Sequence, residues 1–161
     1  MGWLTERENW QYSLKSCRRI GVATDLTGGA NFNIFQVQNA AILVRSIFGV
    51  VTTVIGAGAA VPRIQFTPGG GAQTPLCAAA ATIATDAVGT VYCIGLDGLN
   101  HRLVPCNNLG YVDMDEDVWG GSFMTLLPGT IAITNAVASS GIIDWYIVYQ
   151  PAASNSFVVA L

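Results

Sequence analysis

The sequence predicts an all-β protein, an antiparallel β-sandwich or jelly roll preceded by a short N-terminal arm or helix. From about residue 20 onward, apolar and polar residues alternate with a period of two in short stretches. Turn signals rich in Gly, Pro, Asn and Ser separate these stretches at the roughly 8–12-residue intervals typical of all-β domains. No long helical periodicity follows residue 20, so parallel α/β folds are excluded because they need crossover helices.

The first 19 residues differ from the remainder and are expected to form an arm separate from a sandwich domain over residues 20–161. They carry four of the seven basic residues and two acids, whereas residues 20–161 carry three Arg and eight acids. Residues 5–8 have the spacing of a capping box, and Trp10, Leu14 and Cys17 recur on one helical face. The basic cluster 15–19 would then lie at the C-terminus of a short helix, where cations are favoured.

A helix of about a dozen residues is marginal alone and needs a surface on which to dock. That surface is either the protein's own sandwich or a neighbouring molecule, and the sequence leaves both open. The candidate contact residues of this arm combine aromatic, aliphatic and basic side chains: Trp3, Trp10, Leu14, Arg18 and Arg19.

Eleven stretches are expected to be strands. They span residues 20–24, 32–39, 41–48, 50–55, 63–67, 76–83, 90–94, 102–105, 129–134, 142–149 and 157–161. The clearest alternation places Ile143, Trp145, Ile147 and Tyr149 on one face. The dipeptide at 97–98, Asp-Gly, predicts a tight hairpin. A sandwich or jelly roll is the natural arrangement of about ten such short strands.

Composition narrows the function classes. Only 11% of the 161 residues are charged and 52% are hydrophobic, which excludes intrinsic disorder. The isoelectric point of about 4.8 argues against nucleic-acid binding, which leaves a basic footprint. Mean hydropathy is +0.47, so polar cover is thin for a small monomer, and we expect part of the surface to be buried against a partner.

A membrane-embedded or exported chain is not expected. The uncharged runs 46–62, 64–85 and 118–143 are long enough to cross a bilayer of about 30 Å, but Gly, Pro and Thr interrupt each of them. The N-terminus lacks the apolar region of a signal peptide. Without an export signal, the cysteines at 17, 77, 93 and 106 are expected to be reduced thiols, mostly buried.

Signatures of metal or cofactor chemistry are weak. The cysteines form no CxxC motif and His101 is the only histidine, so a zinc site is not expected. The acidic run 113–117 could bind calcium, but it lacks the EF-hand pattern and reads more simply as a solvated loop. The glycine-rich stretches 28–29 and 69–71 lack the Lys of a phosphate-binding loop. No cofactor is predicted.

The sequence also offers candidate residues for catalysis and for glycan binding. A hydrolytic triad would need His101 as its base, and no GxSxG nucleophile motif is present. Trp119 or Tyr111 beside the acidic run could stack on a sugar, whereas the alternation around Trp145 favours a core position. A carbohydrate-binding module therefore stays open as an alternative, and we expect no enzymatic activity.

Several stretches together form one pattern. They are residues 35–53 (FQVQNAAILVRSIFGVVTT), 84–92 (ATDAVGTVY), 127–131 (LPGTI), 141–151 (GIIDWYIVYQP) and 158–161 (VVAL). This pattern, which covers most of residues 30–161, resembles the small β-rich virion proteins of tailed bacteriophages that act as capsid decoration, or cement, proteins. The arm before residue 20 is not part of the resemblance.

The resemblance implies a non-enzymatic structural virion protein with a jelly-roll or sandwich fold. Such a protein would be made in the host cytoplasm and would sit on the capsid exterior, commonly as a homotrimer bound to the major capsid protein. A head fibre, tail or adaptor component of similar build is the alternative within the virion.

Overall fold

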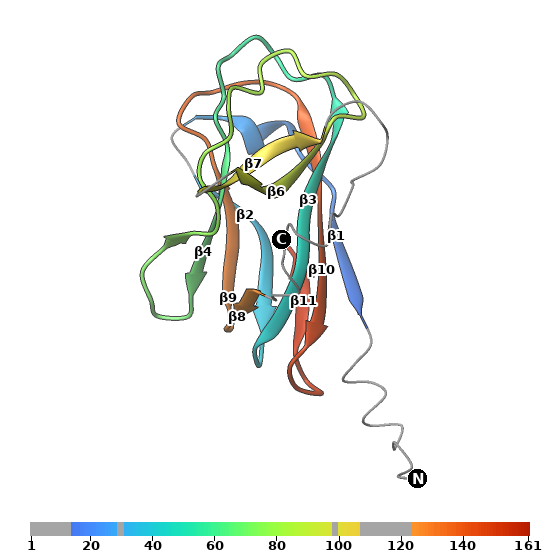
Figure 1. The fold of residues 1–161 in the computed structure, drawn as a ribbon, viewed down its shortest axis with the longest axis vertical. Helices are drawn as coiled ribbons and strands as arrows, with labels where there is room; N and C mark the ends of the chain where they lie inside the picture. Colours follow the sequence, from blue (N-terminus) through green and yellow to red (C-terminus); the bar gives the residue numbers. More distant parts are fainter. Residues whose placement is uncertain (1–13, 29–30, 98–99, 107–123) are drawn as a thin grey trace.

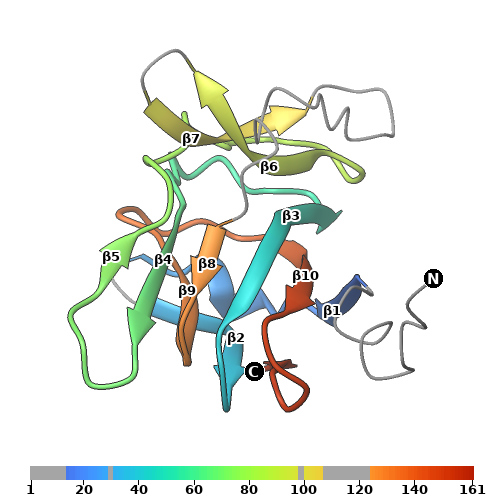
Figure 2. The same ribbon diagram turned by 60° about the horizontal axis from the view of Figure 1, so that its bottom comes forward.

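The protein is an all-β sandwich, as predicted. The computed structural model describes residues 14–28, 31–97, 100–106 and 124–161, with the backbone alone described for 95–97 and 100–106. Two antiparallel sheets pack face to face (Figures 1 and 2). The six-stranded sheet runs β1(Lys15–Arg19), β10(Ile142–Pro151), β3(Ile42–Thr53), β6(Val91–Asp97) and β7(Asn100–Cys106), with β8(Met124–Leu126) also paired to β3. The five-stranded sheet runs β11(Phe157–Ala160), β2(Asn31–Gln38), β9(Gly129–Thr134), β4(Arg63–Pro68) and β5(Thr74–Pro75).

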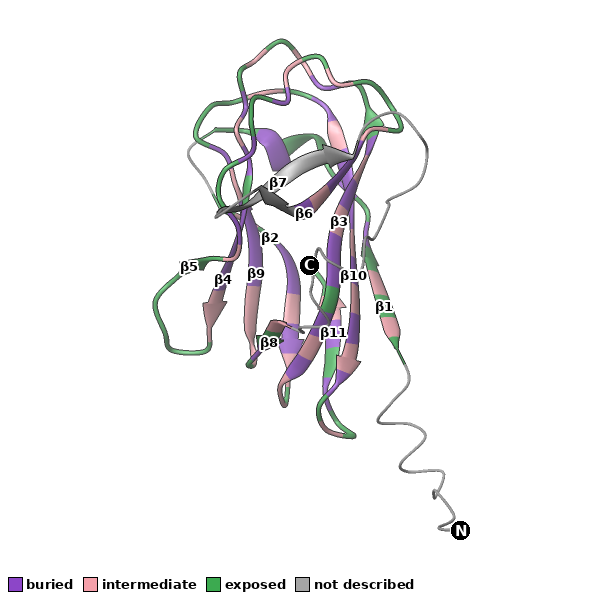
Figure 3. Cartoon of the chain, in the orientation of Figure 1, coloured by how far each residue is buried: buried purple, intermediate pink, exposed green. Residues whose placement is uncertain are grey.

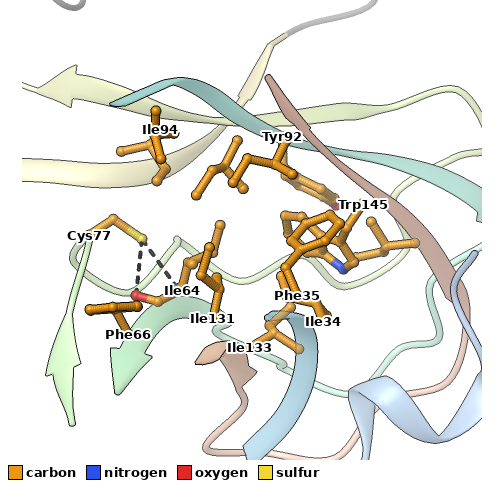
Figure 4. Packing of buried hydrophobic residues seen from close by; sticks show 14 of the residues in the cluster. Ile34, Phe35, Ile64, Phe66, Cys77, Tyr92, Ile94, Ile131, Ile133 and Trp145 are labelled. Carbon is orange, nitrogen blue, oxygen red and sulfur yellow. Dashed lines mark hydrogen bonds between the residues drawn. The ribbon is translucent and has the colours of Figure 1, made fainter. Parts of the chain in front are cut away.

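The predicted alternation along β10 is confirmed. Ile143, Trp145, Ile147 and Tyr149 are each at most 4% exposed, and burial also alternates along most of β3, whereas β4 and β9 each contain three consecutive buried residues (Figure 3). Facing side chains of the five-stranded sheet, such as Phe35, complete the core between the layers (Figure 4). Close packing of large apolar side chains between two sheets is what holds a sandwich together.

A glycine explains why the predicted strands 41–48 and 50–55 are one strand, β3. Gly49 lies opposite Trp145 in the register between β3 and β10. A Cβ at this position would meet the Trp145 ring at 2.9 Å, so the absence of a side chain makes room for the indole. The sequence predicts a break between two strands at this glycine, but the strand continues through it past a bulky neighbour.

Two other strand predictions are wrong. Residues 76–83 form no strand, because short Ala side chains offer little to a pleated surface; the segment instead runs beside β4, with Leu76 N–H donating to Ile64 O at 2.9 Å. Residues 20–24 are also not a strand, since the 3-10 turn η1(Ala23–Leu26) begins there. The predicted hairpin is confirmed, with Asp97 opposite Asn100 in the pairing of β6 and β7.

The expected helix is contradicted over its described part. Lys15–Arg19 is strand β1, which pairs with β10 residue by residue from Lys15 opposite Tyr149 to Arg19 opposite Trp145. The Cys17 side chain packs against the core, and β1 also contacts β11. Arg19 Nε donates to the O atom of Leu161, the residue after β11, at 3.0 Å. Hydrogen bonding to a neighbouring strand therefore outweighs the local helical pattern. These residues belong to the sandwich, so a separate arm can extend only over residues before β1.

The strand directions define two ends of the sandwich. Four segments, residues 20–28, 54–62, 76–90 and 135–141, gather at one end, which lies at the top of Figure 1. We call this the loop end. The turns after β2 and β4 and before β9 lie at the other end.

Candidate functional site

The loop end is a connected structure held by backbone hydrogen bonds between its four segments. Gly56 N–H donates to Ser140 O at 3.0 Å, Ser139 N–H to Leu26 O at 2.8 Å, and Ile55 N–H to Asp86 O at 3.0 Å. Each bond joins segments far apart in the sequence. The loop end is therefore one surface rather than four independent loops.

The exposed residues of this surface are uncharged. Ile20, Val22, Val54, Val88 and Val137 are 69%, 48%, 55%, 59% and 45% exposed, and together they represent all four segments. The other exposed residues of the loop end are Ala, Thr, Gly and Ser (Figure 3). A surface of this composition gives up few strong contacts with water when a partner covers it.

Only two charged residues belong to the four segments, and both bond to groups within the protein. The Asp25 side chain is 2% exposed; Arg19 Nη2 donates to Asp25 Oδ1 at 2.8 Å, and Arg19 Nη1 also pairs with this carboxylate. Val22 N–H donates to Asp25 Oδ2 at 2.9 Å. The hydroxyl of buried Tyr92 donates to the Asp86 carboxylate. Both carboxylates therefore hold loops in place; Asp25 is buried and Asp86 is partly buried.

Burial is the main cause of a raised pKa at Tyr92, and the Asp86 carboxylate adds to the rise through its hydrogen bond and its charge. The phenol therefore stays protonated well beyond the ordinary range of a tyrosine. Its O–H remains available as the donor that fixes Asp86 and, with it, segment 76–90.

The predicted arm residues are dispersed by the structure. Trp3 and Trp10 lie outside the described residues. Leu14 precedes β1 and is 57% exposed. The Arg18 side chain is 55% exposed, with its guanidinium 5.6 Å from the centroid of the Tyr146 ring and Nη2 2.6 Å from Asp144 Oδ2. Arg19 is only 7% exposed, so its guanidinium is an internal anchor rather than a contact available to a partner.

A hollow at the opposite end of the sandwich is a second candidate site. Its volume is about 500 Å³, and its lining includes Gln36, Gln38, Asn39, Thr67 and Thr130 from β2, β4, β9 and the turn after β2. No lining residue is charged. Its geometry suits a neutral polar ligand.

The remaining sequence candidates do not converge on a third site in the described chain. Trp145 is fully buried, which confirms its predicted core position. Trp119, Tyr111, the acidic run 113–117 and the side chain of His101 lie outside what is described. Across the described residues, no group of three or more His, Cys, Asp or Glu could hold a metal ion. The described residues also contain no helix with the length and apolar character needed to span a bilayer.

The described cysteines are thiols. Cys17, Cys77 and Cys93 form no disulfide, and Cys77 is buried beside β4, where Ile64 N–H donates to its Sγ at 3.3 Å. Burial raises the pKa of the Cys17 thiol, although a backbone hydrogen bond with Ala160 opposes that rise. A thiol with a raised pKa is a poor nucleophile at neutral pH, so Cys17 acts as a packing residue at the contact between β1 and β11.

Comparisons with known proteins give no relative: no family model, no curated protein and no solved structure matches the chain.

One signal for the loop end was already present in the sequence. The uncharged runs 46–62 and 64–85 contain two of its four segments, and the run 118–143 contains a third. An uncharged run that is too interrupted to span a membrane can indicate a protein interface instead. The hollow had no such signal, because it depends on which residues lie side by side in the five-stranded sheet.

Proposed function

We propose that the protein is a non-enzymatic structural virion protein, a capsid decoration protein that binds the major capsid protein shell as a homotrimer. Two lines support the proposal. The strand segments at 35–53 and 141–151 resemble those of tailed-phage decoration proteins, and both lie in paired strands of the sandwich. The loop end supplies a surface suited to assembly.

The uncharged loop end is the observation that carries the proposal. The chain has a net charge of −3, so two copies repel each other wherever their charged faces meet. Contact through the loop end avoids that repulsion and buries exposed valines, each square ångström of apolar surface contributing roughly 25 cal/mol. Homo-oligomers commonly have closed cyclic symmetry, and in a trimer each loop end would contact a different part of the neighbouring copy's loop end around the three-fold axis.

Attachment to the shell is assigned to the N-terminal arm. The arm precedes the Lys15 end of β1 in the sequence, and Lys15 is paired with Tyr149 at the end of the sheet away from the loop end. Self-contact and shell contact can therefore occur at the same time. Three arms on one trimer would strengthen attachment through effective concentration, without requiring each arm to bind tightly.

A matched pair of variants tests self-association. Val88 lies at the loop end and Leu127 lies between β8 and β9 at the opposite end, and both are 59% exposed. We expect light scattering after size exclusion to give three times the chain mass of 16.9 kDa for the wild type and for Leu127→Asp. Val88→Asp should be monomeric, because its carboxylate would be buried at the contact.

Shell binding is tested with purified shells of the phage that encodes the protein. Deleting residues 2–13, which spares β1, should leave the trimer intact and reduce occupancy on the shells at least about tenfold, through lost avidity. A wild-type protein that stays monomeric at high concentration and does not sediment with these shells would overturn the proposal. Equal masses for Val88→Asp and Leu127→Asp would show that the loop end is not the surface through which the copies associate.

A further inference from the structure

The five-stranded sheet carries a second feature, which self-association does not use: the hollow between the ends of β2 and β4. The hollow lies where β9 begins, at Gly129, which is opposite Val37 on one side and Pro68 on the other. A Cβ at Gly129 would clash with the carbonyl oxygen of Thr67 and with the buried ring of Phe66, so the close packing of β9 on β4 at this place requires glycine. The lining of the hollow combines glycines, prolines and polar side chains of these strands and their turns.

One row of side chains crosses the sheet at this place. Thr130 pairs with Gln36 on β2 and with Thr67 on β4. Residues directly opposite one another in antiparallel strands point to the same face, so one amide and two hydroxyls lie together on the outer face. In the described chain no hydrogen bond engages the hydroxyl of Thr67 or of Thr130, and both groups are available to a ligand.

The amide groups beside this row are held in place. Gln38 Nε2 donates to Gln36 Oε1 at 3.1 Å, which leaves the Gln36 amide hydrogens directed away from that contact. Asn39 has a left-handed backbone with φ of 67°, and its Nδ2 donates to Asn155 O at 2.9 Å. Side chains fixed by their own hydrogen bonds lose little entropy when a ligand binds.

An exposed aromatic ring stands next to the amides. Phe157 on β11 lies opposite Gln38, and it is 38% exposed on the same outer face. An apolar ring face beside a set of hydroxyl and amide groups matches the two kinds of surface on a sugar ring, which carries C–H groups on its faces and hydroxyls at its edge.

We propose that this hollow binds a neutral saccharide, with Gln36, Thr67 and Thr130 hydrogen-bonding to its hydroxyls and Phe157 packing on a ring face. The volume of about 500 Å³ falls within the roughly 300–1,000 Å³ of ligand pockets. The absence of charge in the lining disfavours acidic sugars and phosphorylated ligands, whose charge would be left unpaired. An added peptide strand is also disfavoured, because β2 and β4 are paired on both sides and offer no open edge.

The test uses the full chain against an immobilised panel of neutral and acidic oligosaccharides, followed by calorimetric titration of the best neutral binder. Thr67→Val with Thr130→Val removes two hydroxyls at constant shape, and we expect binding to weaken at least about tenfold. Thr67→Ser with Thr130→Ser keeps both hydroxyls and should bind within a few-fold of the wild type. Thermal unfolding of each variant establishes that it is folded.

A variant that fills the hollow gives an independent test of saccharide binding. A Cβ at Gly69 would meet only Pro128 O, at 3.6 Å, so Gly69→Trp places a large side chain at the hollow without backbone strain. Binding of the neutral saccharide should be abolished. The proposal is overturned by a wild-type protein that binds no neutral saccharide, by a preference for acidic glycans, or by binding that survives both Gly69→Trp and the double Val variant. Capture of a peptide instead of a saccharide would also overturn it.

Discussion

The two ends of the sandwich are built on the same strands but treat polar groups in opposite ways. At the loop end the two acidic side chains, Asp25 and Asp86, bond to internal groups and each hold a loop, and the exposed residues are uncharged. At the hollow the polar side chains turn outward, and they are amides and hydroxyls rather than ions. The difference indicates two kinds of recognition, one by covering an uncharged surface and one by hydrogen bonding to a neutral ligand.

The largest expected effect comes from breaking the anchor beneath the loop end. Arg19→Met leaves the buried Asp25 carboxylate without its guanidinium partner, and we expect the free energy of unfolding to fall by about 3–5 kcal/mol. Urea unfolding followed by circular dichroism measures this loss. Residue 20–28 amides should also exchange their hydrogens faster, because Val22 and Leu26 lie in the segment that Asp25 fixes.

The control for this prediction removes both charges. Arg19→Met combined with Asp25→Asn leaves no unpaired ion, while the Asn oxygen can still accept from Val22 N–H. The double variant should recover a large part of the lost stability. Equal losses in the single and double variants would show that the ion pair itself is not what holds the loop end.

The sequence could predict the features that depend on the apolar alternation of single strands, but not the buried polar contacts between strands. The bounds of β9 and the buried face of β10 could be predicted because each depends only on the alternation of apolar residues inside one short strand. The pairing of Arg19 with Asp25 did not, because it depends on β1 joining β10, and the local pattern of Trp10, Leu14 and Cys17 favoured a helix. Likewise the hollow depends on the register that sets Gly129 between β2 and β4.

A smaller effect is expected where Tyr92 holds segment 76–90. Tyr92→Phe removes the O–H that donates to Asp86, which should cost about 1 kcal/mol of unfolding free energy near pH 7. The pKa of Tyr92 is raised in the folded state above its ordinary value of 10.0. The unfolded chain therefore releases this proton first, and the stability that Tyr92 contributes is lost as the pH rises above about 10.

The matching measurement is unfolding free energy as a function of pH for the wild type and Tyr92→Phe. The difference between the two should be constant up to about pH 9 and shrink at higher pH. A constant difference through pH 11 would mean that the hydroxyl does not sense the burial and the carboxylate described for it. The loop end would then be held at this place by backbone bonds alone.

The smallest expected effect concerns Asp144, which ties β1 to the base of the loop end. Burial alone would raise the pKa of this carboxyl, but hydrogen bonds from Arg18 and Gly21 N–H, with the charges of Arg18 and Arg19, outweigh burial and lower the pKa. A lowered pKa stabilises the fold above the ordinary value of 3.8, and this contribution is lost as the pH falls below it. Asp144→Asn should therefore be less stable than the wild type near pH 7, and the difference should vanish in acid.

Arg18→Met separates the two opposing influences on Asp144. Without the guanidinium, burial is opposed only by Gly21 N–H and the more distant charge of Arg19, so the pKa of Asp144 should rise relative to the wild type. Carboxyl-carbon resonances followed by pH titration report that pKa directly, and the acid limb of the stability curve should move to higher pH with it. An unchanged Asp144 titration would show that Arg18 is not a fixed partner of β10. Arg18 would then be a surface cation without a fixed partner on β10, in contrast to the buried Arg19 beside it.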